Sequence, residues 1–123
     1  MIFSDTLVHR TYGVATANAL GGDDLPAPTV GSIRASVQRP SNAEVMRFKD
    51  QYVGKRTDDL WLVDTYSALK TVDEPGGRPA DQVDIVDPNG VTRAYEVVAV
   101  QHVRAVIVHY EALVARIAEG KQP

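Results

Sequence analysis

Cysteine is absent from this chain of 123 residues. Its absence excludes disulfides, thiolate metal sites and cysteine nucleophiles, and it leaves the redox compartment open. Long apolar runs are also missing, because no stretch approaches the roughly 20 residues that cross a bilayer as a helix. The first ten residues lack the basic start and apolar stretch of a signal peptide. We therefore expect a chain that is not exported and has no membrane partner.

An excess of positive charge is missing too, since 13 Lys and Arg stand against 16 Asp and Glu for a net charge of −3. A protein that reads DNA sequence usually carries a basic patch, so this balance argues against that class. Hydrophobic residues make up 44% and charged residues 24%, as in ordinary globular proteins. The length suits one core, and we expect a single domain over residues 1–123.

Short patterned runs between Gly- and Pro-rich loops predict strands. Residues 32–38 alternate between apolar and polar side chains, which is the period of a half-buried strand. Residues 60–69 contain Trp, Val, Thr and Tyr and predict a second strand. Residues 6–14 predict another near the N-terminus. The loops at 21–28 and 75–79 separate these elements, because Gly and Pro weaken strand and helix interiors.

Two local motifs predict tight structure. Residues 41–44, Ser-Asn-Ala-Glu, match a capping box and predict a short helix over 42–52. Residues 87–90, Asp-Pro-Asn-Gly, place Pro at the second turn position and supply Asn-Gly where φ is positive. They predict a β-hairpin that joins strands at 82–86 and 91–100.

The segment 103–117 is ambiguous. Its β-branched start favours a strand to about Glu111, whereas residues 112–118 are rich in Ala and Leu and allow a helical end. In one strand, His102 and His109 lie on opposite faces and about 23 Å apart at ~3.3 Å per residue. That spacing makes them poor metal partners, and we interpret the histidines as surface or interface residues.

Together these elements predict a mainly β fold, namely a small antiparallel β-barrel with one short helix and long loops. Residues 1–31 are expected to supply an N-terminal strand followed by an extended arm or loop.

No motif for catalysis or cofactor binding is legible. The serines lack a G-x-S-x-G context, and Gly21-Gly22 is not followed by the Lys-Ser/Thr of a phosphate loop. Asp81, Asp84 and Asp87 recur every three residues, which is not the pattern of a calcium loop. We interpret them as a solvated acidic edge. We therefore expect no enzyme, no catalytic residue, no metal site and no cofactor.

Charge is distributed unevenly along the chain. Basic residues dominate between positions 34 and 56, and acidic residues dominate between 73 and 87. One interpretation is a subunit with a positive and a negative flank, suited to head-to-tail contact around a ring. Two solvated loops that happen to differ explain the pattern equally well. The candidate subunit or channel contacts are Arg39, Arg47, Lys49, Lys55, Arg56, Asp73, Glu74, Arg78, Asp81 and Asp84.

Several segments between residues 32 and 117 follow each other in a familiar order. They are the strand end Val37-Gln38-Arg39-Pro40-Ser41, a short polar helix around Glu44, an aromatic strand over 61–69, Ala80-Asp81-Gln82-Val83, Asn89-Gly90, Ala94-Tyr95-Glu96-Val97-Val98-Ala99-Val100, and His109-Tyr110-Glu111-Ala112-Leu113. This order resembles that of the small head-closure (stopper) and neck proteins of the head–tail connector of long-tailed bacteriophages.

The resemblance implies a β-barrel subunit of a ring, a hexamer, in the virion neck, assembled in the host cytoplasm. Its partners would be further copies of itself, portal-side adaptor proteins and tail-side neck proteins. Genomic DNA would pass through its channel without sequence-specific binding, and a loop from each subunit would help to close the channel. A tail terminator or tail-completion protein is the alternative within this class.

A small OB-like binding module is the alternative from a different class. Such a module needs aromatic residues interleaved with basic ones on one face. The aromatic residues of this chain do not cluster with Arg or Lys in the sequence, which argues against it.

Overall fold

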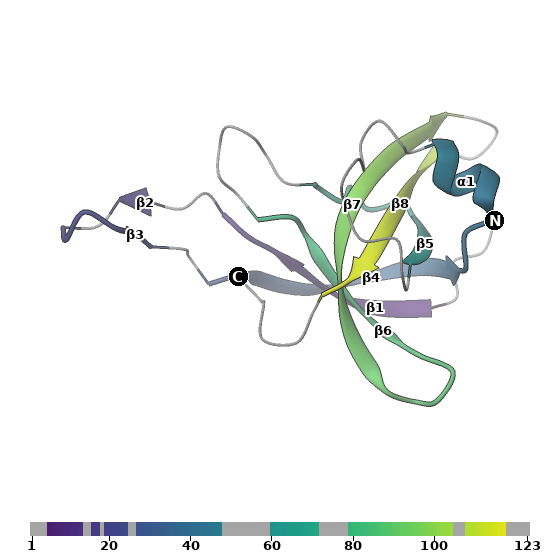
Figure 1. Ribbon diagram of the computed structural model, residues 1–123, viewed down its shortest axis with the longest axis horizontal. Helices are drawn as coiled ribbons and strands as arrows, with labels where there is room; N and C mark the ends of the chain where they lie inside the picture. Colours follow the sequence, from purple (N-terminus) through teal and green to yellow (C-terminus); the bar gives the residue numbers. More distant parts are fainter. Residues whose placement is uncertain are drawn as a thin grey trace.

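Six strands of this chain pair in an antiparallel ladder that returns to its own start, forming a closed barrel in the order β1-β4-β5-β8-β7-β6 (Figure 1). This computed structural model describes residues 5–13, 16–17, 19–24, 27–47, 60–71, 79–104 and 108–117. The barrel strands are β1 (Asp5–Thr11), β4 (Thr29–Gln38), β5 (Leu60–Thr65), β6 (Gln82–Val86), β7 (Thr92–Arg104) and β8 (Val108–Arg116). The predicted mainly β barrel is confirmed.

The interior of the barrel is filled by every second residue of its strands, as the two-residue period of a strand requires. Ile33 and Ala35, which the alternation of residues 32–38 places on one face, are both buried. Tyr95 is the largest fully buried side chain of the described residues and belongs to this interior cluster. The other buried members are Leu7, Val63, Leu69, Val83, Ile85, Val97, Ala112 and Val114.

A second apolar cluster lies on the outer face of β5, β8 and β7, and Val45 of the helix α1 (Asn42–Arg47) packs against it. Its buried members are Leu60, Leu62, Val98, Ala99, Leu113 and Ala115. The register of β7 against β8 shifts between Val97 and Ala99, which makes Val98 the extra residue of a β-bulge. Consequently Val97 joins the interior cluster, whereas Val98 and Ala99 both join the outer one.

The helical end considered for residues 112–118 is wrong for residues 112–116, which belong to β8. Ala112 and Val114 fill the interior, and Leu113 and Ala115 fill the outer cluster. Because β8 is buried on both faces, small and apolar residues suit it whatever their helix propensity. The expected single strand through 103–111 is also wrong, since β7 ends at Arg104 and β8 begins at Val108.

The strand predicted over 60–69 ends early, at Thr65. The Thr65 hydroxyl donates to the carbonyl of Arg34 at 2.7 Å and accepts the backbone N–H of Ser67 at 3.3 Å. This local turn takes the chain out of the ladder, and Leu69 then folds back into the interior cluster.

The predicted capping box is confirmed at the start of α1. Ser41 N donates to Glu44 Oε1 at 2.9 Å, and Glu44 N donates to Ser41 Oγ at 3.2 Å. Residues 48–52 of the predicted helix lie outside the described residues. Among the helical residues that the structure describes, no helix has the length and apolarity needed to cross a membrane.

The predicted hairpin of β6 and β7 is also confirmed, and Asp87 organises its turn. The Asp87 carboxylate accepts the backbone N–H groups of Asn89 and Val91 at 2.9 and 3.0 Å. Gly90 N donates to the Asp87 carbonyl at 2.9 Å, and Gly90 has a φ of 83°. These bonds satisfy the turn's donors, and the positive φ favours glycine at position 90.

Replacing Gly90 with Ala is expected to lower the free energy of unfolding by about 1 kcal/mol, because an L side chain is strained at this φ although the space around it is open. Urea denaturation measures the change. Gly31→Ala is the matched control, since Gly31 also has open space but no positive φ in strand β4. Equal losses in the two variants would show that the turn geometry is not responsible.

The backbone N–H bond from Val91, assisted by those from Asn89 and by Arg93, holds the pKa of the Asp87 carboxyl below its ordinary value. The ionised form is thus favoured in the folded state, so its stabilisation is present above the ordinary pKa and is lost as pH falls through the folded-state pKa. We expect the stability advantage of the natural chain over Asp87→Asn to be full near pH 6. It should shrink below about pH 4. Urea midpoints across this range measure it, and a difference independent of pH would contradict the expectation.

Candidate functional site

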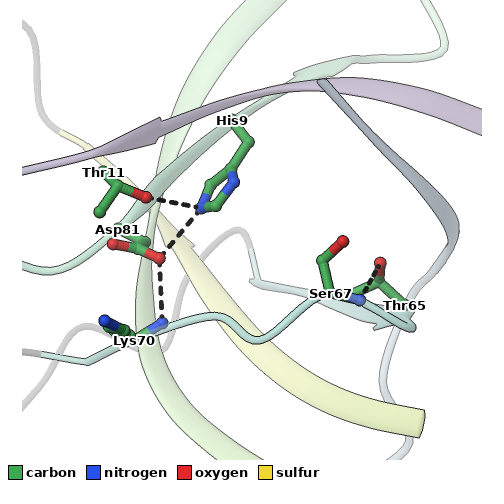
Figure 2. Close-up of polar contacts among 6 residues, drawn as sticks. All are labelled: His9, Thr11, Thr65, Ser67, Lys70 and Asp81. Carbon is green, nitrogen blue, oxygen red and sulfur yellow. Dashed lines mark hydrogen bonds and ion pairs between the residues drawn. The ribbon is translucent and has the colours of Figure 1, made fainter. Parts of the chain in front are cut away.

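The barrel closes along a short seam between β1 and β6, where only His9↔Val83 and Arg10↔Gln82 are paired. On the inner side of this seam, His9 Nε2 lies 3.0 Å from the carboxylate of Asp81, whose exposure is 1% (Figure 2). The same carboxylate oxygen accepts the backbone N–H of Lys70 at 3.1 Å. Asp81 thereby joins β1, the start of β6 and the segment that follows β5.

A hydroxyl completes this group, because Thr11 Oγ1 lies 3.2 Å from His9 Nε2 (Figure 2). The trio resembles the acid, base and nucleophile of a hydrolase only in composition. In that arrangement the carboxylate and the hydroxyl contact opposite nitrogens of the imidazole ring. Here the carboxylate and the hydroxyl both contact Nε2, so the His9 ring does not lie between Asp81 and Thr11 and cannot pass a proton from one to the other. The group is therefore suited to holding the seam closed.

On the outer side of the seam, Arg10 binds two residues of β6. Its guanidinium donates to both carboxylate oxygens of Asp84, and its Nε donates to Gln82 Oε1 at 3.3 Å. The hydrogen bond to Asp84 raises the pKa of Arg10, although partial burial opposes the shift. This bidentate pair adds a second clamp across the same two strands.

Trp61 of β5 packs, partly buried, against the interior cluster. Its Nε1 donates to the hydroxyl of Tyr95 at 3.1 Å, and the guanidinium of Arg39 lies 3.8 Å from the centre of its ring. Arg39 also donates to the carbonyl of Leu60 at 2.9 Å. The expectation that aromatic residues of this chain do not cluster with Arg or Lys is therefore wrong for Trp61. Strand β4 ends just before Arg39 and lies beside β5, so residues 22 positions apart meet.

A cavity of about 360 Å³ opens beside Trp61. Apolar side chains and three aspartates line it, among them Leu7, Trp61, Ile85, Asp5, Asp84 and Asp87. Because Asp84 is paired with Arg10 and Asp87 with Arg93, this lining suits a mainly apolar, neutral group.

A third polar group lies on the outer face of the barrel, next to the outer apolar cluster. Asp64 of β5 is directly opposite Glu111 of β8, and His109 is two residues before Glu111 on the same face. His109 and Asp64 are both 5% exposed, and His109 Nε2 lies 4.0 Å from Asp64 Oδ1. The interpretation of the histidines as surface or interface residues is therefore wrong for His109.

The two C-terminal histidines are also much closer than a single strand would allow. The β7–β8 pairing sets His102 opposite Tyr110, on which its ring stacks at 4.5 Å, and sets Val103 opposite His109. The two histidines remain on opposite faces of the ladder, as predicted, but a change of strand direction brings them side by side.

A hairpin arm leaves the barrel between β1 and β4. It consists of β2 (Thr16–Ala17) paired with β3 (Asp23–Asp24), and Figure 1 shows both strands well away from the barrel. Gly21, with a φ of 84°, forms its turn, and the side chain of Leu20 beside it is 96% exposed. This two-stranded arm therefore has an apolar side chain at its tip.

The structure places four of the ten candidate contact residues. Arg39 covers Trp61, Arg47 ends α1, and Asp84 pairs with Arg10. Asp81 is buried, which corrects its interpretation as part of a solvated acidic edge and removes it from the barrel surface. The candidates that lie outside the described residues are Lys49, Lys55, Arg56, Asp73, Glu74 and Arg78.

Known proteins give no guide to this site, since no family model, curated protein or solved structure matches the chain. Function is therefore inferred from the residues and their geometry.

Sequence reasoning missed two features of these sites. Leu20 is a single apolar residue beside the Gly21-Gly22 turn, and nothing in its sequence context indicates that its side chain is 96% exposed. The spacing of His109 and Glu111 signals a shared strand face, but their partner Asp64 is 45 residues earlier and only the β5–β8 register brings it near.

Replacing Asp81 with Asn is expected to cost about 2 kcal/mol of unfolding free energy, because the buried amide loses the charge-assisted bond with His9 and must bury an extra N–H donor. Asp84→Asn, three residues further on in β6, is the control, and its loss should stay below about 1 kcal/mol because the pair with Arg10 is partly solvated. Urea denaturation measures the loss of unfolding free energy in each variant. A larger loss for Asp84→Asn would show that the outer Arg10–Asp84 pair stabilises the seam more than the inner His9–Asp81 contact does.

Proposed function

We propose that this chain is a structural protein of the head–tail connector of a long-tailed bacteriophage. Copies of it form a ring in the virion neck that joins the portal-side adaptor to the tail and helps to close or line the DNA channel. The observation that carries the proposal is the hairpin arm with Leu20 exposed at its tip. The resemblance of residues 32–117 to stopper and neck proteins supports it independently.

The arm supports assembly because its apolar tip is exposed in the isolated subunit. A two-stranded hairpin is marginally stable in water by itself, and an apolar side chain that is 96% exposed gains free energy when a partner surface covers it. Within the described residues, each barrel strand pairs with a neighbour on both sides, so the barrel offers another copy only the short unpaired stretches of β1 and β6 beside their two-pair seam. Contact between copies is therefore expected through the arm, and an arm that binds a different surface of the next copy generates a ring when the rotation closes.

The charge of the chain supports a channel through which DNA slides. Nonspecific DNA affinity comes mainly from Lys and Arg that neutralise phosphates. With a net charge of −3, each subunit adds negative charge to the ring, which limits adhesion of the passing DNA.

One observation favours the binding-module alternative, namely the pairing of Arg39 with Trp61 at the 360 Å³ cavity. Base stacking on an aromatic ring beside a cation is typical of single-strand binding. However, the described residues that line this cavity include neither Lys nor Arg, so a phosphate backbone finds no cation inside it. The connector proposal therefore accounts for more of the described surface.

Assembly is tested by light scattering on the purified chain, followed by negative-stain imaging with candidate portal and adaptor proteins. We expect a ring, alone or on the portal–adaptor stack, and the side to which it binds separates a stopper from a tail terminator. Leu20→Asp should weaken assembly at least tenfold, because burying a carboxylate in an apolar contact is costly. Val108→Asp is the matched control, since Val108 is 53% exposed and lies on β8, away from the arm.

Circular dichroism of Leu20→Asp should show the same barrel as the natural chain, since Leu20 lies outside both apolar clusters. A strict monomer that joins no stack and binds oligonucleotide would contradict the proposal and favour the binding module. Equal effects of the two Asp substitutions would remove the arm from the assembly contact.

A further inference from the structure

We propose that Asp64, His109 and Glu111 form a binding site for one divalent transition-metal cation, Zn²⁺ in the first instance, on the outer face of the β5–β8 pair. The convergence of three ligand atoms from two adjacent strands carries this inference. It is independent of the connector proposal, because it concerns an isolated subunit.

The β5–β8 register sets the three residues on one face. Asp64 and Glu111 are direct cross-strand partners, and His109 precedes Glu111 by two positions. The positions that flank this pair in the neighbouring strands are neutral, with Ser36 of β4 opposite Asp64 and Gln101 of β7 opposite Glu111. The sheet therefore presents two carboxylates and one imidazole together.

The distances suit a bridging ion. One ligand atom from each residue lies within 4.8 Å of the other two, and His109 Nε2 is 4.0 Å from Asp64 Oδ1. That separation is too long for a hydrogen bond. Zinc binds nitrogen and carboxylate oxygen at about 2.0–2.2 Å, so two ligands of one tetrahedral ion lie about 3.3–3.6 Å apart. The pair at 4.0 Å has to close by about half an ångström, and a pair at the 4.8 Å limit by somewhat more than one ångström, which side-chain rotation provides.

Burial gives the site its affinity and its selectivity. The side chains of His109 and Asp64 are only 6% and 8% exposed, and their facing atoms are sealed from solvent. Two carboxylates that are direct cross-strand partners repel each other, and a cation between them removes that repulsion. Glu111 is half-buried, so the site has access to solvent on its side and a water molecule can complete a tetrahedral set.

The donor set selects the class of metal. One imidazole nitrogen with two carboxylate oxygens suits Zn²⁺, Co²⁺ or Mn²⁺. Calcium prefers six to eight oxygen ligands, and an imidazole does not serve it. A bound ion would cross-link β5 and β8 beside the outer apolar cluster, so its role would be structural.

The test uses the full chain after dialysis against a chelator. Isothermal titration with Zn²⁺ should give one equivalent, and Co²⁺ should develop the visible absorption of a low-symmetry site. A saturating Zn²⁺ concentration should raise the melting temperature by several degrees, since an ion that binds only the folded chain stabilises it. Ca²⁺ at the same concentration should cause no shift.

Variants locate the ion. His109→Gln and Glu111→Gln should each weaken Zn²⁺ binding at least tenfold, and His102→Gln should leave it unchanged, since His102 lies on the opposite face against Tyr110. If the variant of the buried His109 does not fold, Zn²⁺ binding by Glu111→Gln is the decisive measurement. Three results would overturn the proposal: no Zn²⁺ binding by the natural chain, binding that survives the Glu111 substitution, or an equal response to Ca²⁺.

Discussion

The seam between β1 and β6 is the contact on which the barrel depends. Backbone pairing there is limited to two residue pairs, and the side chains supply what the ladder lacks. His9 reaches Asp81 from the inside and Arg10 reaches Asp84 from the outside, so the seam is clamped on both faces. A barrel without this closure is an open sheet with two free edges. Asp81 and Asp84 therefore have a structural role, because they hold β1 against β6.

Much of the fold could be predicted from the sequence because its signals are local. The capping box before α1, the Asp87–Gly90 turn and the alternation within β4 each depend on neighbours a few residues away. Strand ends were harder to predict. β5 ends at Thr65, whose hydroxyl donates a hydrogen bond to the carbonyl of Arg34. The strand propensity of the residues after Thr65 does not predict that bond.

The sites could be predicted only in part, since each is made by long-range pairing. Asp81 meets His9, and Asp64 meets His109, only after the strands have found their registers. From residue type alone, Asp81 is predicted to be a solvated carboxylate and His109 a surface histidine, because Asp and His are usually found there. The arm could be foreseen as an extended region, but the exposure of Leu20 follows from its place at a turn with no core beneath it.

The structure combines a barrel that has a buried core with an arm that has an exposed apolar tip. The barrel buries apolar residues on the inner face and, over β5, β8 and β7, on the outer face as well. The arm pairs β2 with β3 and exposes the side chain of Leu20 at its turn. In the proposed assembly the barrel would supply the scaffold of each subunit, and the arm would supply a contact with its neighbour.

The seam also shapes the order of folding. His9 and Asp81 are 72 positions apart, whereas the hairpins β6–β7 and β7–β8 join residues that are close in the chain. Closing a loop of this length costs more entropy than closing a hairpin, so we expect the seam to form after the hairpins. During synthesis β1 leaves the ribosome long before β6 exists to receive it. The nascent chain therefore carries an unpaired edge until its final strands arrive.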